Sequence, residues 1–339
     1  SILHSENMVT SNNTTKMCEA NDILIARYGA SIGKILTGLA GAYNVAIMRT
    51  IPDTSRIKKL YLYYYLKSPY FQNAILNVGS RAAQAGFNKE DLSKLDIECP
   101  ELIKQDKIIA VLEKLECIIE KRKIELSNLD DLIKARFVEM FGDPVSNPYG
   151  YDKVALSDLA DIKIGPFGSL LHKEDYIDGG HPLLNPSHIV DGKVSPDDKL
   201  TISDEKYEEL SAYQLKTGDV VMGRRGEMGR CAVVPEDGFL CGTGSMLIRT
   251  KGEVTADYIQ KIISFPSFKK TIEDMAVGQT MPNLNVPIVS GFQIIKPPME
   301  VQDRYYAFAE QVNKSKVAVQ KALDETQILF DSLMQKYFG

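Results

Sequence analysis

The chain has 339 residues, of which 44% are apolar and 25% charged, and its formal net charge is −5. This composition excludes a disordered chain, because disordered proteins are poor in apolar residues and carry a high net charge. The sequence has neither the apolar run of about 18 residues that a membrane-spanning helix needs nor a signal-peptide pattern, so we expect a cytoplasmic protein without membrane contact. With a negative net charge, any nucleic-acid surface must be a local patch of basic residues.

The cysteines and histidines form no recognisable metal or disulfide pattern. Five cysteines stand far apart, at positions 18, 99, 117, 231 and 241, which predicts free thiols. His172, His181 and His188 lie within seventeen residues of one another, but their spacing is not that of a metal site. We therefore expect no metal and no cofactor.

An internal repeat appears when the chain is aligned with itself at a shift of 197 residues. Residues 22–29 then fall on 219–226, Pro100 falls on Pro297, and residues 141–142 fall on 338–339. A repeat of this length indicates two copies of a domain followed by a connector, since solenoid repeats are only about 20–50 residues long. Because Ser1 aligns with Asp198, the first copy lacks a counterpart of about residues 150–197, and we expect either a fragment or a rearranged gene product.

In chain order, the first copy begins with a globular part at residues 1–101, in which strand and turn signals are interrupted by helical patterns at 57–67 and 71–77. Pro100 closes this part. Residues 102–142 then form a long helical pattern without an internal proline or glycine.

The second copy repeats this order, with a globular part at 143–298 and a helix at 299–339. Strand patterns occupy 219–222 and 246–250, and helical patterns follow at 257–263 and 268–276. The sequence thus predicts an α+β protein with two mixed α/β domains and two long helices.

Each long helix carries an apolar seam whose positions alternate by three and four residues, and seven of nine seam positions are apolar in each helix. The seam positions are Leu112, Leu115, Ile119, Arg122, Leu126, Leu129, Ile133, Arg136 and Met140, then Ala309, Val312, Lys316, Val319, Leu323, Thr326, Phe330, Leu333 and Tyr337. This pattern predicts an antiparallel coiled coil of the two helices, each roughly 55 Å long. The alternative is that each helix packs only on its own domain. The polar seam residues can set register or partner choice at a cost in stability.

No catalytic constellation stands out. Residues 29–35 resemble a phosphate-binding loop, but Ile35 occupies the position where a Ser or Thr would reach the magnesium ion. Asp197, Asp204 and Lys206 fit a metal nuclease only loosely, and that enzyme remains one alternative. We expect that the chain is not an enzyme.

The best binding signal lies in paired glycine loops and in a second pair of turns. Glycine lets the backbone approach a ligand closely, arginine suits bidentate contacts to phosphate or guanine, and Gln and Asn read adenine. The candidate DNA-binding residues are Arg27, Tyr28, Lys34, Arg81 and Gln84 in the first copy, and Arg224, Arg225, Arg230, Gln279 and Asn283 in the second. These residues differ between the copies, so the two domains would read different sequences.

The segment at 96–105, the heptad helix after it and the segment at 137–144 resemble the end of a target-recognition domain and the spacer helix of type I restriction-modification specificity (S) subunits. Residues 294–302, the second helix and residues 336–339 resemble them too, and 154–162 followed by Gly165 is similar to that family's domain opening. The similarity extends over essentially the whole chain.

This resemblance implies that each domain reads one half of a split, asymmetric double-stranded DNA target. The paired helices would set the gap between the halves and dock two methyltransferase (M) subunits of an adenine-methylating complex, with restriction (R) subunits; the chain itself would have no catalytic residues. Within the seam, the apolar residues expected to serve the coiled coil and partner docking are Leu112, Leu115, Ile119, Leu126, Leu129, Ile133, Val312, Val319, Leu323, Phe330 and Leu333. A coiled-coil scaffold whose domains bind protein is the other alternative.

Overall fold

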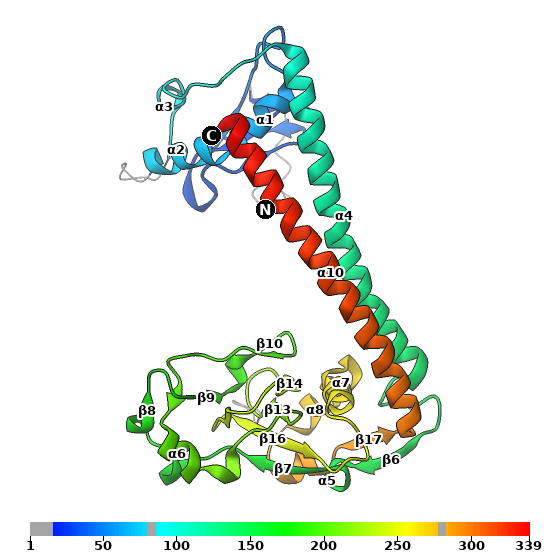
Figure 1. Ribbon diagram of the computed structural model, residues 1–339. Helices are drawn as coiled ribbons and strands as arrows, with labels where there is room; N and C mark the ends of the chain where they lie inside the picture. The colour runs from blue at the N-terminus through cyan, green and yellow to red at the C-terminus, as the bar shows by residue number, and fades with distance from the viewer. Residues whose placement is uncertain (1–15, 80–85, 277–282) are drawn as a thin grey trace. The chain divides into compact units, whose positions relative to one another are not determined.

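The computed structural model describes residues 16–79, 86–276 and 283–339 (Figure 1). The chain divides into two compact units, the first made of residues 1–128 and 315–339 and the second of residues 129–314. Two helices of 40 residues, α4 (Leu102–Phe141) and α10 (Met299–Phe338), each contribute to both units. No helix in the described ranges is long and apolar enough to cross a membrane.

The first unit is built on a small antiparallel sheet in which β2 lies between β3 and β5. β1 and β4 form a separate antiparallel pair. The elements of this unit outside the long helices are β1 (Met17–Cys18), β2 (Leu24–Ala26), η2 (Gly29–Ser31), β3 (Ile35–Leu36), β4 (Gly41–Ala42), β5 (Ile47–Arg49), α1 (Lys59–Lys67), α2 (Pro69–Gly79) and α3 (Lys89–Leu92).

The second unit contains a four-stranded antiparallel sheet in the order β14-β13-β16-β7 and a second sheet in the order β15-β9-β12-β8. Two pairs, β10–β11 and β17–β6, complete its strands. Its strands are β6 (Asp152–Ala155), β7 (Ala160–Ile164), β8 (Tyr176–Ile177), β9 (His181–Leu184), β10 (Ile189–Val190), β11 (Lys193–Val194), β12 (Thr201–Ile202), β13 (Val220–Gly223), β14 (Cys231–Val233), β15 (Leu240–Cys241), β16 (Ser245–Thr250) and β17 (Gln293–Lys296). Its shorter helices are α5 (Leu156–Leu159), α6 (Asp204–Glu209), α7 (Ala256–Ser264), α8 (Pro266–Met275) and α9 (Val286–Ser290), with 3-10 turns at Gly168–Leu170, Lys173–Asp175, Pro186–His188 and Ser211–Tyr213.

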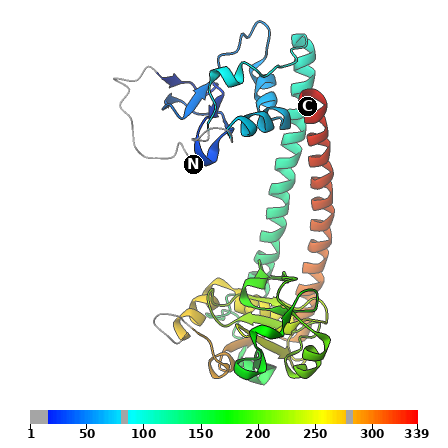
Figure 2. The ribbon, with the colours of Figure 1, turned by 90° about the vertical axis from the view of Figure 1, so that its left-hand side faces the viewer.

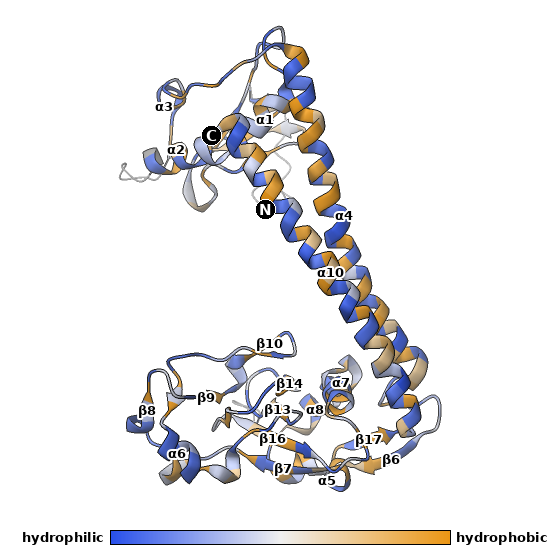
Figure 3. Ribbon diagram, in the orientation of Figure 1, coloured by the Kyte–Doolittle hydropathy of each residue, from blue (hydrophilic) through white to orange (hydrophobic). Residues whose placement is uncertain are grey.

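The two long helices run in opposite directions (Figures 1 and 2), and side chains of both lie in the core of each unit. Every predicted seam position is buried or half-buried. Hydrophobic and hydrophilic residues alternate along both helices, as the seam requires (Figure 3). The predicted α+β fold class with two long paired helices is confirmed. The alternative that each helix packs only on its own domain is wrong, because the end of α10 lies in the core of the first unit.

Polar seam residues meet each other inside the first unit. The guanidinium of Arg122 on α4 donates to the backbone carbonyl of Ala322 and to the hydroxyl of Thr326 on α10. Thr326 also donates to the carbonyl of Ala322 at 2.7 Å, so its hydroxyl is satisfied while it accepts from the arginine. The half-buried guanidinium reaches both acceptors in this register, and polar seam residues of this kind can set the register of two paired helices.

The internal repeat is visible as duplicated side-chain contacts. Tyr61 donates to the carbonyl of Glu98 at 3.0 Å, and Tyr258, 197 residues later, donates to the carbonyl of Ile295 at 2.9 Å. Both tyrosines are 1% exposed or less, and burial raises the pKa of each phenol above its ordinary value. The same hydrogen bond therefore holds the segment before the long helix in both copies.

A buried glutamine at the start of each long helix is duplicated in the same way. Gln105 accepts from the backbone amide of Lys58 at 2.8 Å and donates to the carbonyl of Pro100 at 2.7 Å. Gln302 accepts from the amide of Thr255 at 3.3 Å and donates to the carbonyl of Pro297 at 3.0 Å. Neither side chain is exposed, so each glutamine fastens its helix to the domain that precedes it.

Candidate nucleic-acid interface

The loop between β13 and β14 carries three of the predicted arginines in the second unit. Gly226 and Gly229 in this loop have φ values of +79° and +72°, which residues with a side chain rarely adopt. A Cβ on Gly229 would stand 2.9 Å from Cγ of Lys269 and 3.0 Å from the carbonyl oxygen of Ile263. Glycine at this position lets the loop lie directly against the end of α7 and the start of α8.

The predicted second turn meets this loop at Asn283. Nε of Arg224 donates to Oδ1 of Asn283 at 3.1 Å, and Arg225 forms a β-bridge with the same residue. The backbone amide of Leu284 donates to the carbonyl of Arg224 at 3.0 Å. Arg224 is half-buried and Arg225 is exposed, and burial together with the charge of Arg225 lowers the pKa of Arg224. Asn283 therefore orients one guanidinium beside a second that faces solvent.

The third arginine of the loop is held in an ion-pair cluster. Oε2 of Glu227 accepts from Nε of Arg230 at 3.1 Å and from Nη2 at 2.5 Å, while Nη1 of Arg230 donates to the carbonyl of Pro186 at 3.2 Å. Oε1 of Glu227 accepts from Nζ of Lys269 on α8 at 3.2 Å. These hydrogen bonds, first from Arg230 and then from Lys269, lower the pKa of the Glu227 carboxyl. Sequence reasoning missed Glu227 and Lys269, although a glutamate three residues before a loop arginine is a usable signal.

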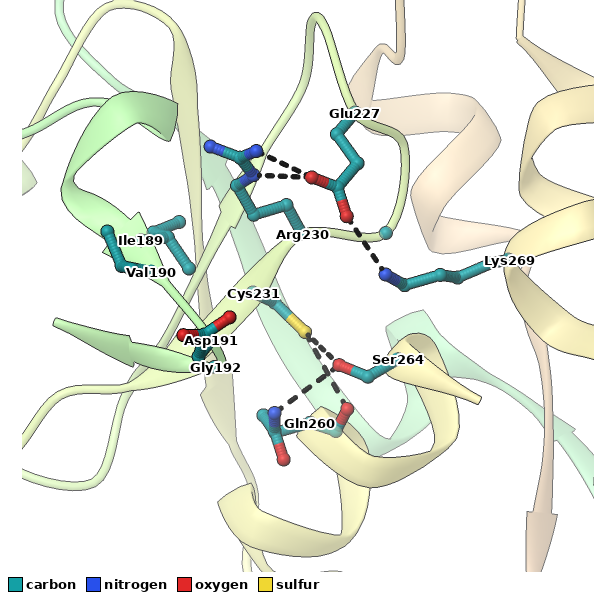
Figure 4. Close-up of a pocket in the computed structure, with 11 residues that line it drawn as sticks. Ile189, Val190, Asp191, Gly192, Glu227, Arg230, Cys231, Gln260, Ser264 and Lys269 are labelled. Atoms are coloured by element: carbon teal, nitrogen blue, oxygen red, sulfur yellow. Dashed lines mark hydrogen bonds and ion pairs between the residues drawn. The ribbon is translucent and has the colours of Figure 1, made fainter. Parts of the chain in front are cut away.

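This ion-pair cluster borders a cavity of about 470 Å³ between the β10–β11 hairpin, the arginine loop and helices α7 and α8 (Figure 4). Below the ion pairs, Sγ of Cys231 lies 3.3 Å from Oγ of Ser264, and Nε2 of Gln260 donates to that hydroxyl at 3.3 Å. Burial raises the pKa of the Cys231 thiol to about 11, so it stays protonated near neutral pH. The cavity thus has a neutral polar floor and charged groups near its rim.

The corresponding loop of the first unit has the same backbone contacts and other side chains. Tyr28 forms a β-bridge with Gly86, as Arg225 does with Asn283. Nε of Arg27 donates to the carbonyl of Phe87 at 3.1 Å, and Nη2 donates to the hydroxyl of Tyr28 at 3.0 Å. A Cβ on Gly86 would stand 2.4 Å from the ring of Tyr28, so glycine is needed where that ring crosses the chain.

Lys34 ends the loop of the first unit, as Arg230 ends that of the second. The carbonyl of Lys34 accepts from the amide of Ala26 at 2.9 Å, and its side chain is exposed. Gln72, which aligns with Lys269, donates to the carbonyl of Gly33 at 2.9 Å. Arg81, Gln84 and Gln279, the remaining predicted DNA-binding residues, lie outside the described residues.

The residues of the nuclease alternative make contacts with different neighbours. Asp204 lies 3.1 Å from Nε2 of His181, while the ammonium of Lys206 pairs with Glu209 at 3.1 Å. Asp197 accepts from the amide of Lys199 at 3.0 Å in a local turn. Within the described ranges, no group of three His, Cys, Asp or Glu side chains could hold a metal ion.

Comparison with known proteins matches the model described as type I restriction modification DNA specificity domain to residues 4–128 and 148–326. The MjaIX specificity subunit of a type I restriction enzyme from Methanocaldococcus jannaschii is 22% identical over 320 residues, which cover 86% of this chain and 71% of the relative. A chain from a structure described as the basis of complex assembly and conformational transition of the type I R-M system has a TM-score of 0.65 at 18% identity, covering 95% of this chain and 83% of that one.

The type I restriction-modification S subunit from M. genitalium has a TM-score of 0.56 at 14% identity, covering 97% of this chain and 86% of that one. At these identities the two structures show a common fold. The match of the family model extends over most of the sequence, in two segments that fall on the two copies of the repeat. The chain belongs to the type I restriction-modification specificity subunits, the non-catalytic components that carry the DNA specificity domain.

Proposed function

We propose that this chain reads a two-part, asymmetric DNA target, one part with each copy of the repeat. The observation that carries the proposal is the loop-and-turn pair formed twice with different side chains. Arg224, Arg225 and Asn283 meet in the second unit, where Arg27, Tyr28 and Gly86 meet in the first. Phosphate contacts would position both domains on the duplex, and these side chains would select the bases.

The side chains at the two loops suit different bases. An arginine can bind O6 and N7 of guanine with two hydrogen bonds, and an asparagine can bind adenine in the same way. In the second domain Asn283 already engages Nε of Arg224, which fixes the direction of the guanidinium. In the first domain Cζ of Arg27 lies 4.9 Å from the ring centroid of Tyr28. This domain therefore presents an aromatic ring where the second domain presents the guanidinium of Arg225. Two different surfaces imply two different half-sites.

We further propose residues 1–101 and 143–298 as the target-recognition domains and residues 102–142 and 299–339 as spacer helices that dock two M subunits and the R subunits in the cytoplasm. The seam residues already pack between the helices, so docking would use their outer faces. In the first unit those faces carry exposed apolar side chains at Ile124, Val317, Ile328 and Leu329, which are 50–70% exposed. A docked subunit would cover these apolar side chains.

Salt dependence of DNA binding tests the proposal against the protein-binding scaffold. We expect the purified chain, with its M partner, to bind duplex DNA with an affinity that falls linearly on a log–log plot against salt. The slope should be about −0.9 for each phosphate neutralised, because DNA binding by basic residues releases counterions. Fluorescence anisotropy between about 50 and 200 mM salt measures it. Binding that is absent, or that ignores salt, would favour the scaffold.

A further inference from the structure

The ion-pair cluster joins Glu227 and Arg230 of the proposed DNA-reading loop to Lys269 on α8, and the carboxylate cancels one of the two positive charges. The carboxylate receives three hydrogen bonds, two from Arg230 at 3.1 and 2.5 Å and one from Lys269 at 3.2 Å. A phosphate oxygen pair would receive the same donors, since guanidinium and ammonium groups bind carboxylates and phosphates alike. Glu227 therefore gives the two cations the same kind of acceptor that a phosphate would offer.

We propose that Glu227 is an internal competitor of the DNA backbone, which holds Arg230 and Lys269 in the free protein and lowers the affinity of the second domain for DNA of any sequence. The inference rests on the proposed function and adds a specificity-determining residue to it. A DNA phosphate would displace the carboxylate only where base contacts elsewhere in the domain hold the duplex in place.

Exposure of the cluster makes such an exchange feasible. The side chains of Glu227, Arg230 and Lys269 are 53%, 34% and 32% exposed, and ion pairs in contact with water contribute little to stability. Exchange needs only the Glu227 side chain to turn away, because that side chain is exposed while its neighbour Met228, at 4% exposed, stays in the core. Nη1 of Arg230 donates to the carbonyl of Pro186 at 3.2 Å, so one hydrogen bond of the guanidinium does not depend on Glu227.

Arg230 and Lys269 are the positively charged residues that line the cavity beside Glu227. Asp191, at the tip of the β10–β11 hairpin, is the other carboxylate that lines the cavity, and Cys231, Gln260 and Ser264 are neutral. With Glu227 in place the cavity lining carries two positive and two negative charges, and without it the positive charges are in excess.

The first domain lacks this arrangement, which makes the proposal specific to one half of the molecule. Its loop has Ala30, Ser31 and Ile32 between Gly29 and Gly33, so no carboxylate stands there. Lysine 269 is replaced by Gln72, which binds the backbone of the loop instead. Only in the second domain would an internal carboxylate lower the affinity for DNA that the domain does not recognise.

Glu227→Gln tests the proposal, with Glu236→Gln as the matched control that removes one exposed carboxylate of the same unit. Binding of each full-length variant, with its M partner, to a target duplex and to a scrambled duplex is measured between about 50 and 200 mM salt. We expect Glu227→Gln to bind scrambled DNA about tenfold more tightly at the lower salt. The log–log slope of affinity against salt should become more negative by about 0.9 for each of the one or two phosphates that the freed cations neutralise. The ratio of target to scrambled affinity should fall.

Adding Arg230→Gln and Lys269→Gln to Glu227→Gln should abolish the gain, because no cation is then released. Equal effects of Glu227→Gln and Glu236→Gln would overturn the inference, since the change would reflect net charge alone. Weaker binding to the target only would also overturn it, because Glu227 would then position Arg230 for a base contact. If the unsubstituted chain binds neither duplex, the proposed function itself fails and this inference fails with it.

Discussion

Replacing Phe141 by alanine is expected to lower the free energy of unfolding of the second unit by about 3–5 kcal/mol, the usual cost of removing a buried phenylalanine. Phe141 ends α4 and has no exposed surface. Its ring lies 4.9 Å from that of Phe137, 5.2 Å from Tyr258 and 5.3 Å from Tyr305. Truncation would leave a cavity that three aromatic rings cannot close without losing their own contacts.

Hydrogen exchange of the full chain measures the effect within the unit concerned. Protection should fall in α7 and β17, which share the core of Phe141, while α1 in the first unit should keep its protection. Val138→Ala on the same helix is the control, because Val138 is 45% exposed and the change should stay within about 0.5 kcal/mol. Equal loss of protection in both variants would contradict the role given to Phe141.

Phe338 gives the same test in the first unit. It ends α10 and its ring lies 5.0 Å from that of Tyr61, the counterpart of Tyr258. Each long helix therefore ends in the core of the unit that contains the other copy of the globular domain. Phe338→Ala should expose α1 to exchange and leave α7 protected, the reverse of Phe141→Ala.

The second large effect is expected at the arginine pair. Arg224→Ala should weaken binding of the target duplex by about 1–3 kcal/mol, or roughly 5- to 150-fold, if the guanidinium binds a guanine with two hydrogen bonds. The loss should be largest for the one base pair that it reads, because its Nε is already committed to Asn283 and its direction is fixed. Arg225→Ala should act at a neighbouring position, since that side chain is exposed beside it.

Band shifts with the target and with duplexes substituted at single positions measure this effect. Arg304→Ala, which removes an exposed arginine from α10 in the same unit, is the control for the loss of charge. An Arg224→Ala variant that binds target and substituted duplexes as the unsubstituted chain does would remove Arg224 from the interface. A uniform loss on all duplexes would make it a phosphate contact.

The architecture was predictable from the sequence because the chain contains two copies of the same domain and helix. The long helices and their seam follow from periodicity, and the structure has them as α4 and α10. The strands around residues 219–222 and 246–250 follow from β-branched runs bounded by glycines, and the structure has them as β13 and β16. The shift of 197 residues also identified Arg27 and Tyr28 as counterparts of Arg224 and Arg225, and Tyr28 and Arg225 form equivalent β-bridges.

The side-chain contacts that cross from one copy to the other were not predictable. Periodicity identifies the seam but cannot tell which residue faces Arg122, and the partner proves to be Thr326 and the carbonyl of Ala322. The cluster at Glu227 lies within one copy but was not predictable either, because its second cation, Lys269, is 42 residues away in sequence. Only packing of α8 against the loop brings the two charges together.

The central claim is that the two copies read separate halves of one target. Long-read sequencing that records methylated adenines tests it most directly. The hosts compared both carry the gene for the M subunit, and only one carries the gene for this chain. The account predicts an asymmetric motif in two parts with a fixed gap, and Arg224→Ala should relax one part and leave the other unchanged. A single continuous motif, or relaxation of both parts by that one substitution, would contradict it.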